Sequence, residues 1–268
     1  MKIACIQPRF HKWRKESYDL TEKLIDKLLN EYSHVEIITL PERWVPFHRV
    51  FTDNLQKERG GDYKFIQGLA EKYGIKIISG AIWEKRNDSE NYVTCYFFNE
   101  KGKEVGRQDK IHLYSYEKEN FIPGKQLKLF KIKDYHFSIL ICFDMAFFET
   151  PRLATEHGAD FLVSPTQIRE EGMHNWKIYL KARALENRIP VIACNTYGRI
   201  FKRKFIGNSQ IISFEENFYS PSKLKRIQGP MNESGFVFDD INLNFPQKLR
   251  KIRLNERIKK ENIEIVKE

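Results

Sequence analysis

Phe137-Ser-Ile-Leu-Ile-Cys142-Phe-Asp144 is an apolar run that ends in a cysteine and an acid. The run has the length and β-branched content of a buried strand, and a helix-compatible stretch begins a few residues later at Glu149. A strand, a sharp turn and a helix in this order would expose the Cys142 side chain at the turn, as a nucleophile elbow does. The segment predicts an α/β fold with a reactive position at a strand end.

The same alternation of short β-rich runs and amphipathic stretches continues on both sides of this segment. It favours an α/β architecture over an all-α or all-β one. Asp62 suits the N-cap of one helix, and Gly74 suits its C-terminal stop. The expected helices are residues 18–31, 62–73, 149–157 and 173–187, and the expected strands are residues 2–6, 35–40, 75–80, 91–99, 102–109, 127–132, 136–142, 161–164 and 191–195.

The chain has 268 residues, of which 41% are hydrophobic, so it can bury the core of one large domain or two small ones. No linker rich in Pro or Gly divides it. Beyond residue 214 the regular pattern fades and ends in a charged, helix-compatible tail. We therefore expect one domain over residues 1–214, with residues 215–268 as a C-terminal extension of the same domain, available to pack on a neighbouring subunit.

The formal net charge of +10 raises the hypothesis of a nucleic-acid-binding protein. Lys and Arg are, however, spread along the chain among Asp and Glu, with local excess only at residues 202–204 and in the tail. No nucleic-acid-binding signature accompanies them, so we expect no nucleic-acid partner. No apolar run is long enough to span a membrane, and the N-terminus lacks the apolar region of a secretory signal. We expect a cytoplasmic protein.

The four cysteines lie far apart and include no Cys-x-x-Cys pair, which indicates neither a zinc site nor a disulfide scaffold. Cys5, Cys95 and Cys194 sit inside apolar, strand-like runs, where a free cysteine usually behaves as a small buried hydrophobe. We interpret these three as core residues. Cys142 differs from them because it stands at the end of its strand.

Two other apolar strands also end in a charged residue, at Glu42 and at Lys110. Strand ends in α/β folds hold catalytic groups on a rigid scaffold. Taken singly, Glu42 fits a solvated strand end, Lys110 a surface lysine and Cys142 a buried thiol. The order of these three residues along the chain, together with the sequence around each, is a more specific signal than any one residue.

The chain resembles the nitrilase superfamily of carbon-nitrogen hydrolases between about residues 2 and 214. The matching segments are Leu40-Pro-Glu42, Lys110-Ile-His-Leu113, Glu117-Lys-Glu-Asn-Phe-Ile-Pro-Gly124, Ile141-Cys-Phe-Asp-Met-Ala-Phe-Phe-Glu-Thr-Pro-Arg152, Ala182-Arg-Ala-Leu-Glu-Asn187 with Asn195, and Phe205-Ile-Gly-Asn-Ser209. Phe148 replaces a usual Pro and Phe143 a common Tyr. The segment 166–172 is more charged than expected near a substrate pocket, which leaves the substrate open.

The resemblance implies a four-layer α-β-β-α sandwich that forms a homodimer or higher homo-oligomer and needs no metal or organic cofactor. It implies the catalytic set Glu42, Lys110 and Cys142, with Glu117 positioning Lys110. A carboxylate such as Glu42 can take the proton of the thiol. Lys110 and the backbone N–H of Phe143 would stabilise the oxyanion. The expected substrate is a small carboxamide or N-carbamoyl compound, hydrolysed through a Cys142 thioester.

Two alternative functions stay open, a nitrile hydrolase and a non-catalytic binding member of the same fold. In the nitrile branch Trp-Glu typically follows the cysteine, whereas this chain has Phe143-Asp144. The intact catalytic set argues against a non-catalytic role. Glu117 also fits a purely structural partner of Lys110.

Polar residues near these motifs have structural interpretations. We expect His112 to be a hydrogen-bonded structural histidine. Arg43 could meet a substrate carboxylate or lie exposed at the surface. A larger group is interpreted as buried polar partners that fix the elbow: Asp144, Glu149, Arg152, Arg183, Glu186 and Asn187.

Overall fold

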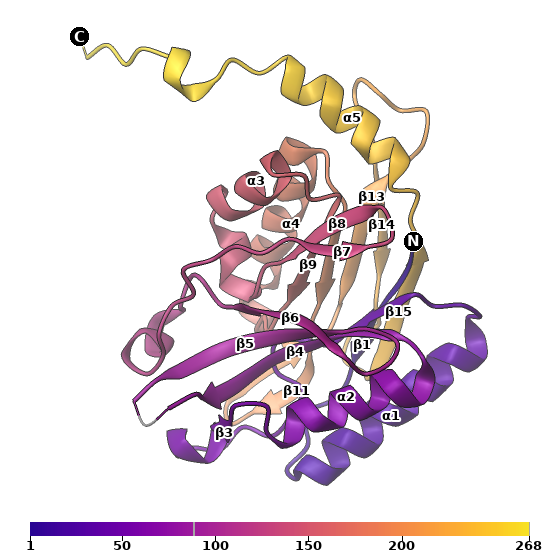
Figure 1. The fold of residues 1–268 in the computed structure, drawn as a ribbon, viewed down its shortest axis with the longest axis vertical. Coiled ribbons are helices and arrows are strands. Elements are labelled where there is room, and N and C mark those ends of the chain that lie inside the picture. Colours follow the sequence, from indigo (N-terminus) through magenta and orange to yellow (C-terminus); the bar gives the residue numbers. More distant parts are fainter. Residues whose placement is uncertain (88, 268) are drawn as a thin grey trace.

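The structure, a computed structural model, describes residues 1–87 and 89–267. Two main sheets face each other, and helices cover their outer faces (Figure 1). Along the described chain the first sheet has the order β15-β1-β2-β4-β5-β6, with β3 beside β4, and the second has the order β14-β13-β10-β9-β8-β7. This architecture confirms the predicted α-β-β-α sandwich.

The elements have the following bounds. The first sheet contains β1 (Lys2–Gln7), β2 (Ile37–Thr39), β3 (Gln56–Lys57), β4 (Lys76–Lys85), β5 (Asn91–Phe98), β6 (Glu104–Asp109) and β15 (Gly235–Asp240). The second contains β7 (Phe130–Ile132), β8 (Tyr135–Ile139), β9 (Phe161–Pro165), β10 (Val191–Cys194), β13 (Gln210–Phe214) and β14 (Leu224–Gln228). A separate hairpin is formed by β11 (Tyr197–Ile200) and β12 (Arg203–Ile206).

Helices connect these strands. The α-helices are α1 (Arg14–Glu31), α2 (Gly61–Tyr73), α3 (Glu149–Glu156), α4 (Met173–Asn187) and α5 (Asn244–Asn255). Short 3-10 turns are η1 (Phe51–Asn54), η2 (Ser115–Glu119), η3 (Cys142–Ala146), η4 (Glu170–Gly172) and η5 (Lys260–Asn262).

Both faces of the central strands are buried, which explains their nearly continuous apolar sequence. In β1, Ile3 and Cys5 enter the core between the two sheets, while Ala4 and Ile6 face the layer that contains α1 and α2. On the other side, α3 and α4 pack on the second sheet through residues such as Leu180. Three apolar layers therefore separate four layers of secondary structure.

The parallel strands bring their carboxyl ends to one end of the sandwich. In the first sheet β1, β2 and β4 are parallel, and in the second β8, β9 and β10 are parallel. Residues that directly follow β2, β6 and β8 therefore converge at this end, where ligands of open α/β sheets bind. These residues include Glu42, Lys110 and Cys142.

The predicted helices and strands before residue 214 are all present, with shifts of a few residues at their ends. One capping assignment is wrong, because Gly60 is the N-cap of α2 and Asp62 lies inside its first turn. Asp62 instead accepts hydrogen bonds from Arg14 and Tyr18 of α1, each at 2.7 Å. Gly74 ends the helix in the left-handed conformation, as predicted.

The segment after residue 214 is more regular than its sequence pattern indicates. Strand β14 pairs with β13, and β15 pairs antiparallel with β1, so the segment adds an edge strand to each main sheet. The N-terminal amine donates a hydrogen bond to the carbonyl of Ile241 at 2.8 Å, beside this edge. We accordingly propose that residues 215–268 extend the same domain.

Gly80 allows the loop before Glu42 to approach β4 closely. Its φ is +69°, and a β-carbon at this position would lie 2.1 Å from the carbonyl oxygen of Pro41. The register of β4 against β5 shifts at this point, between Ile78 and Ala81. A side chain here would push the Pro41 carbonyl away and displace the neighbouring Glu42.

We predict that Gly80→Ala destabilises the protein more than Gly74→Ala does. Gly74 has a similar φ of +61° but no atom within 4 Å of an added β-carbon, so it reports the conformational penalty alone, about 1–2 kcal/mol. The clash at Gly80 should add at least about 1–3 kcal/mol. Urea unfolding of both variants measures the difference, and equal losses of unfolding free energy would contradict the packing described for Gly80.

Candidate active site

Two strand ends and a short 3-10 turn place ionisable side chains in direct contact. Glu42 follows β2, Lys110 follows β6, and Glu117 lies in η2 just beyond it. The Lys110 ammonium donates to Glu42 Oε1 at 2.6 Å and to Glu117 Oε1 at 2.9 Å. Glu117 also accepts a hydrogen bond from the backbone N–H of Tyr114 at 2.7 Å. The structure thus brings these three predicted residues together as one hydrogen-bonded group.

This group is almost completely removed from solvent. Lys110 is 1% exposed, Glu42 5% and Glu117 4%. A buried lysine is tolerated only when opposite charges and hydrogen bonds replace its hydration. Two carboxylates satisfy that requirement here.

Cys142 occupies the strained turn that its sequence predicts. Its φ is +45°, a region that residues other than glycine seldom adopt. The turn leads from β8 through η3 into α3, and Cys142 is partly buried against the central core. Such strain persists only where surrounding contacts enforce it, and it is concentrated at functional sites.

Asp144 supplies several of those contacts. Its buried carboxylate accepts hydrogen bonds from the backbone N–H of Ile141 at 2.9 Å and from that of His112 at 2.7 Å. The His112 ring nitrogen Nδ1 lies 3.0 Å from the same carboxylate, and the ring stacks on Phe147. Asp144 therefore joins the Cys142 turn to the loop that follows Lys110, and His112 has the structural role predicted for it.

Phe143 presents a free backbone donor beside the cysteine. Its N–H has no acceptor within the part of the chain that the structure describes. Its ring packs edge-to-face against Tyr114 and Phe147, with centroids 5.2 and 5.0 Å away. The ring contacts hold the backbone of the turn, while the N–H remains available to a ligand.

The remaining residues that were expected to fix the elbow differ in burial and in what they contact. Arg183 holds the turn directly, because it donates to the carbonyls of Met145 at 3.1 Å and Ala146 at 2.9 Å. Asn187 is buried as expected, whereas Arg152 and Glu186 are only half-buried, so the expectation is wrong for these two. Arg152 donates to the backbone carbonyl of Glu186 at 3.0 Å. Glu149 was expected to be a buried partner, and this is wrong: it is exposed in the first turn of α3, where a negative charge favours the helix dipole.

Arg43 is buried, so the expectation of an exposed surface arginine is wrong. It is 2% exposed, and its Nη2 donates to Asn54 Oδ1 at 2.8 Å. The guanidinium carbon lies 4.1 Å from the ring centroid of Trp83 and 4.7 Å from that of Phe47. Favourable cation–π contacts thus replace part of its hydration.

The loop after β9 is a part of the site that sequence reasoning missed. The N–H of Glu42 donates to the carbonyl of Thr166 at 3.2 Å, and the backbone of Gln167 lowers the pKa of the Cys142 thiol, although burial and Glu42 outweigh this effect. Asn195, which the sequence motifs include, holds this loop by accepting from Ile168 N–H at 2.9 Å. Every residue has backbone donors and acceptors, so the sequence does not indicate which of them line a site. Only the charge of this segment stands out in the sequence.

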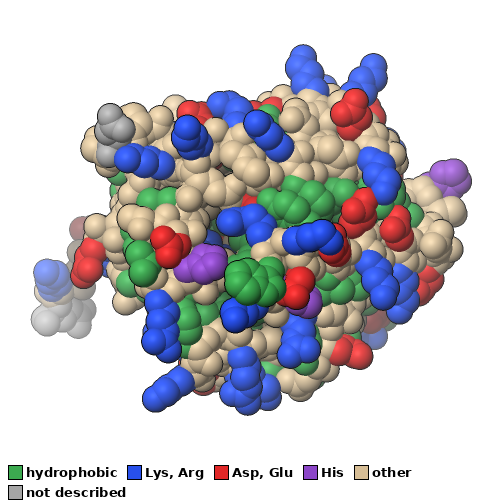
Figure 2. Space-filling model, turned by 90° about the horizontal axis from the view of Figure 1, so that it is seen from below, with side chains coloured by type: hydrophobic (Ala, Val, Ile, Leu, Met, Phe, Trp, Pro, Cys, Tyr) green, Lys and Arg blue, Asp and Glu red, His purple; other side chains and the backbone are tan. Residues whose placement is uncertain are grey.

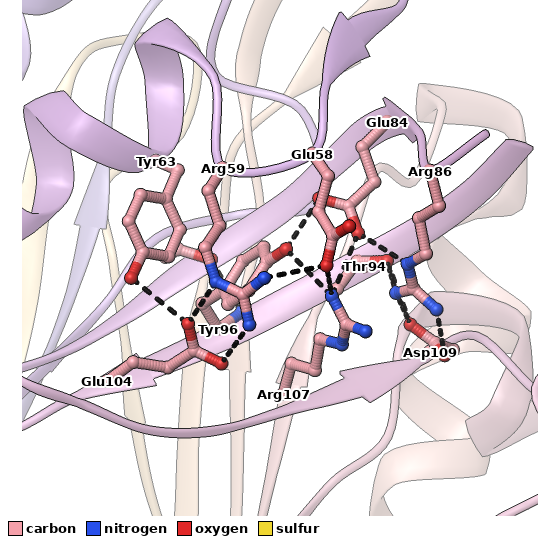
Figure 3. A network of polar contacts seen from close by, with 11 residues as sticks. Glu58, Arg59, Tyr63, Glu84, Arg86, Thr94, Tyr96, Glu104, Arg107 and Asp109 are labelled. Atoms are coloured by element: carbon pink, nitrogen blue, oxygen red, sulfur yellow. Dashed lines mark hydrogen bonds and ion pairs between the residues drawn. The ribbon is translucent and has the colours of Figure 1, made fainter.

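A polar network on the outer face of the first sheet fixes the end of β6 (Figure 3). Arg86 donates to Glu84 and to Asp109, each at 2.8 Å, and Thr94 donates to Asp109 at 2.8 Å. Since successive side chains of a strand point to opposite faces, an outward Asp109 directs the next residue, Lys110, toward the space between the sheets. The network therefore helps to place the ammonium.

The electrostatics of the group follow from its burial. Burial on its own would lower the pKa of Lys110, but Glu42 and Glu117 outweigh this effect and raise the pKa well above its usual value. Burial raises the pKa of Glu117 despite the opposing charge of Lys110. Burial, followed by the charge of Glu42, raises the pKa of the Cys142 thiol well above its usual value. At neutral pH, Cys142 is therefore a thiol.

Among the described residues, no cluster of three or more His, Cys, Asp or Glu side chains could hold a metal ion. Within the same residues, no helix is long and apolar enough to cross a membrane.

We predict that alkylation of Cys142 by iodoacetamide accelerates with pH without levelling off below about pH 9, because the raised pKa keeps the thiolate fraction small until then. Stopped-flow alkylation monitored by peptide mass spectrometry measures the rate at each pH. Cys142→Ala is the blank, and a wild-type plateau below pH 8 would contradict the description.

Comparisons with known proteins agree with this geometry. A family model described as carbon-nitrogen hydrolase matches residues 2–220. A probable nitrilase of Schizosaccharomyces pombe is 36% identical over 155 residues, which are 57% of this chain and 57% of that protein. The 2-oxoglutaramate amidase of Bacillus subtilis is 30% identical over 215 residues, covering 78% of this chain and 82% of that protein.

A solved structure supports the same assignment at the level of the fold. Nit3 of Saccharomyces cerevisiae, a member of branch 10 of the nitrilase superfamily, superimposes with a TM-score of 0.83 at 21% identity, covering 98% of this chain and 97% of that one. The family match spans most of the chain and confirms the resemblance found in the sequence motifs. The chain belongs to the carbon-nitrogen hydrolase family of the nitrilase superfamily.

Proposed function

We propose that this protein is an amidase that hydrolyses a small carboxamide or N-carbamoyl compound through a thioester on Cys142. One observation carries the proposal: a buried ammonium, Lys110, is bonded to two carboxylates at the same end of the sandwich as a strained cysteine. Buried ionisable groups of this kind are concentrated at catalytic sites. The family membership and the 2-oxoglutaramate amidase relative support an amide substrate.

The first half of the reaction forms the acyl-enzyme. Glu42 takes the thiol proton of Cys142 as the sulfur attacks the carbonyl carbon of the amide. The negative charge that develops on the carbonyl oxygen is stabilised by the Lys110 ammonium and by the backbone N–H of Phe143. The intermediate then collapses: its C–N bond breaks, and protonated Glu42 gives the proton to the departing nitrogen. Ammonia or an amine leaves, and the acyl group stays on sulfur.

The second half releases the acid. A water molecule loses a proton to Glu42 and attacks the thioester carbonyl. The C–S bond then breaks, the carboxylic acid leaves, and protonated Glu42 returns its proton to the sulfur, which restores the thiol. Because the thiol pKa is raised, the cysteine reacts only when Glu42 accepts its proton, so the carboxylate is needed in both halves. Glu117 positions Lys110 and keeps the ammonium charged.

We predict that Cys142→Ala abolishes turnover and that Glu42→Gln lowers kcat by about 10²–10⁴-fold, the usual contribution of a general base. Lys110→Met should lower kcat by at least about 10²–10³-fold, the loss typical of a missing oxyanion donor. Ammonia release from short carboxamides, N-carbamoyl amino acids and nitriles measures these effects.

Cys95→Ala is the matched control, because it makes the same change at a buried thiol in the core between the sheets. It should keep wild-type turnover. Full activity in Cys142→Ala would overturn the mechanism, and hydrolysis of nitriles alone would replace the amidase by a nitrile hydrolase. Turnover of none of the three substrate classes would favour a non-catalytic binding member of the fold.

A further inference from the structure

Asn195 holds the loop that follows β9. Its side-chain Oδ1 accepts from the N–H of Ile168 at 2.9 Å and from the hydroxyl of Thr166 at 3.3 Å. Its Nδ2 donates to the carbonyl of Gly207, directly after β12, at 2.7 Å. Asn195 is only 1% exposed, so water does not compete for these bonds. One side chain thus joins the loop after β9 to the end of the β11–β12 hairpin.

The backbone of Asn195 is fixed in turn by Ser209 and Gln7. The N–H of Asn195 donates to Ser209 Oγ at 2.9 Å, and Gln7 Oε1 accepts from both the N–H and the hydroxyl of Ser209 at 2.9 Å. Gln7 Nε2 donates to the carbonyls of Pro230 and Glu233 at 2.8 and 2.9 Å. Because Gln7 and Ser209 are also buried, each polar group depends on the others for its hydrogen bonds.

These contacts connect the two sheets at the end where the site lies. Gln7 ends β1 of the first sheet, whereas Thr166 and Asn195 follow β9 and β10 of the second. Thr166 leads back to the first sheet, because its carbonyl accepts from the N–H of Glu42 at 3.2 Å. Since β1 and β2 pair in parallel, the path from Gln7 to Glu42 is closed. We call Gln7, Ser209, Asn195 and Thr166 the Asn195 network.

Three consecutive residues of the loop connect Asn195 to both reacting groups. Thr166 holds the backbone of Glu42, and the backbone of Gln167 lowers the pKa of the Cys142 thiol. The third residue is the one whose N–H donates to Asn195. A shift of these three residues would therefore move the base relative to the thiol.

The side chains of the Asn195 network are covered from solvent, each being at most 1% exposed. The β11–β12 hairpin begins two residues after Asn195, and its exposed side chains include Arg199, Lys202 and Arg203. Seen from below, on the side where β11 lies in Figure 1, Lys and Arg side chains are spread across the face (Figure 2). The buried network can affect the reaction only through the residues that it bonds.

We propose that Asn195 is a positioning residue that sets the position of Glu42 relative to Cys142. This inference rests on the proposed amidase function. Transfer of the thiol proton needs the two groups within hydrogen-bond reach, and a misplacement of about 1 Å can lower a rate about 10²-fold. The rival explanation is that Asn195 only stabilises the fold. Its loss would then lower the melting temperature without changing the rate of the folded enzyme.

The experiment follows acylation of Cys142 by p-nitrophenyl acetate. The sulfur attacks the ester carbonyl, the thiol proton passes to Glu42, and the C–O bond breaks to release p-nitrophenolate, which is measured by its absorbance. In Asn195→Ala, the rate constant of this burst should fall by about 10- to 100-fold. Cys142→Ala gives the background. A burst rate constant equal to that of the wild type would overturn the inference.

Ser209→Ala serves if Asn195→Ala does not fold. It removes the hydroxyl that accepts from the Asn195 N–H but leaves the Asn195 side chain in place. The burst rate constant should still fall by at least about threefold, because the backbone of Asn195 is less well held. No change in this variant would overturn the inference as well.

A double-mutant cycle shows whether Asn195 acts through Glu42. The Glu42→Gln variant has no base to position, so adding Asn195→Ala should lower its burst rate constant by less than about threefold. A further loss as large as that in the wild type would mean that Asn195 acts on another group, and it would overturn the inference.

Asp160→Asn is the matched control. Asp160 is buried just before β9, at the opposite end of the strand from Thr166, and it accepts from the N–H of His136 and pairs with Arg250, each at 2.9 Å. Both substitutions weaken buried polar contacts beside the same strand, so both should lower the melting temperature. Only Asn195→Ala should slow the burst at a temperature where both variants are folded. An equal loss in Asp160→Asn would support the rival explanation.

Amide turnover separates this inference from the proposed function. With propionamide, Asn195→Ala should lower kcat and leave KM within about threefold of the wild type. If no amide is hydrolysed but the ester burst depends on Asn195, the amidase proposal fails and the positioning role stands. If amides are hydrolysed and Asn195→Ala keeps the wild-type kcat, the positioning role fails alone.

Discussion

The bond between the Lys110 ammonium and two buried carboxylates is the constraint on which the rest of the structure depends. A lysine that is 1% exposed is stable only if Glu42 and Glu117 reach it, and these residues come from different segments of the chain. The surrounding structure satisfies this requirement. Gly80 lets the Glu42 loop approach, the network around Asp109 directs Lys110 inward, and Asp144 ties the lysine loop to the cysteine turn.

The same constraint explains how a cysteine with an unfavourable thiol pKa can serve as a nucleophile. Burial and the charge of Glu42 favour the protonated thiol, so a free thiolate does not accumulate. In the mechanism that we propose, the proton leaves only when the substrate carbonyl accepts the sulfur and the oxyanion is stabilised. In that mechanism Glu42 both keeps the resting cysteine protonated and receives its proton, so the reactive state depends on bound substrate.

The sequence was sufficient to predict the features that local pattern encodes. Alternating apolar runs predicted the sheets, and the reactive residues were assigned because the motifs around them resemble those of a known family. Contacts between distant segments were not predictable in this way. The edge strand β15 pairs with β1 across most of the chain, so no local pattern marks it. Arginine is usually a surface residue, and only the fold shows that Trp83 and Phe47 cover Arg43. Glu149 is exposed although Thr150 and Pro151 beside it are buried, a difference that the sequence pattern does not indicate.

The central claim is that the acyl group is carried by Cys142, and mass spectrometry of an acid-quenched reaction tests it most directly. The enzyme is mixed with an amide substrate, stopped within the first turnovers and digested. The account predicts that the peptide containing Cys142 gains the mass of the acyl group, and that hydroxylamine removes this mass, since a thioester is cleaved by that nucleophile. An acyl group on any other residue, or rapid turnover in which the Cys142 peptide never gains mass, would contradict it.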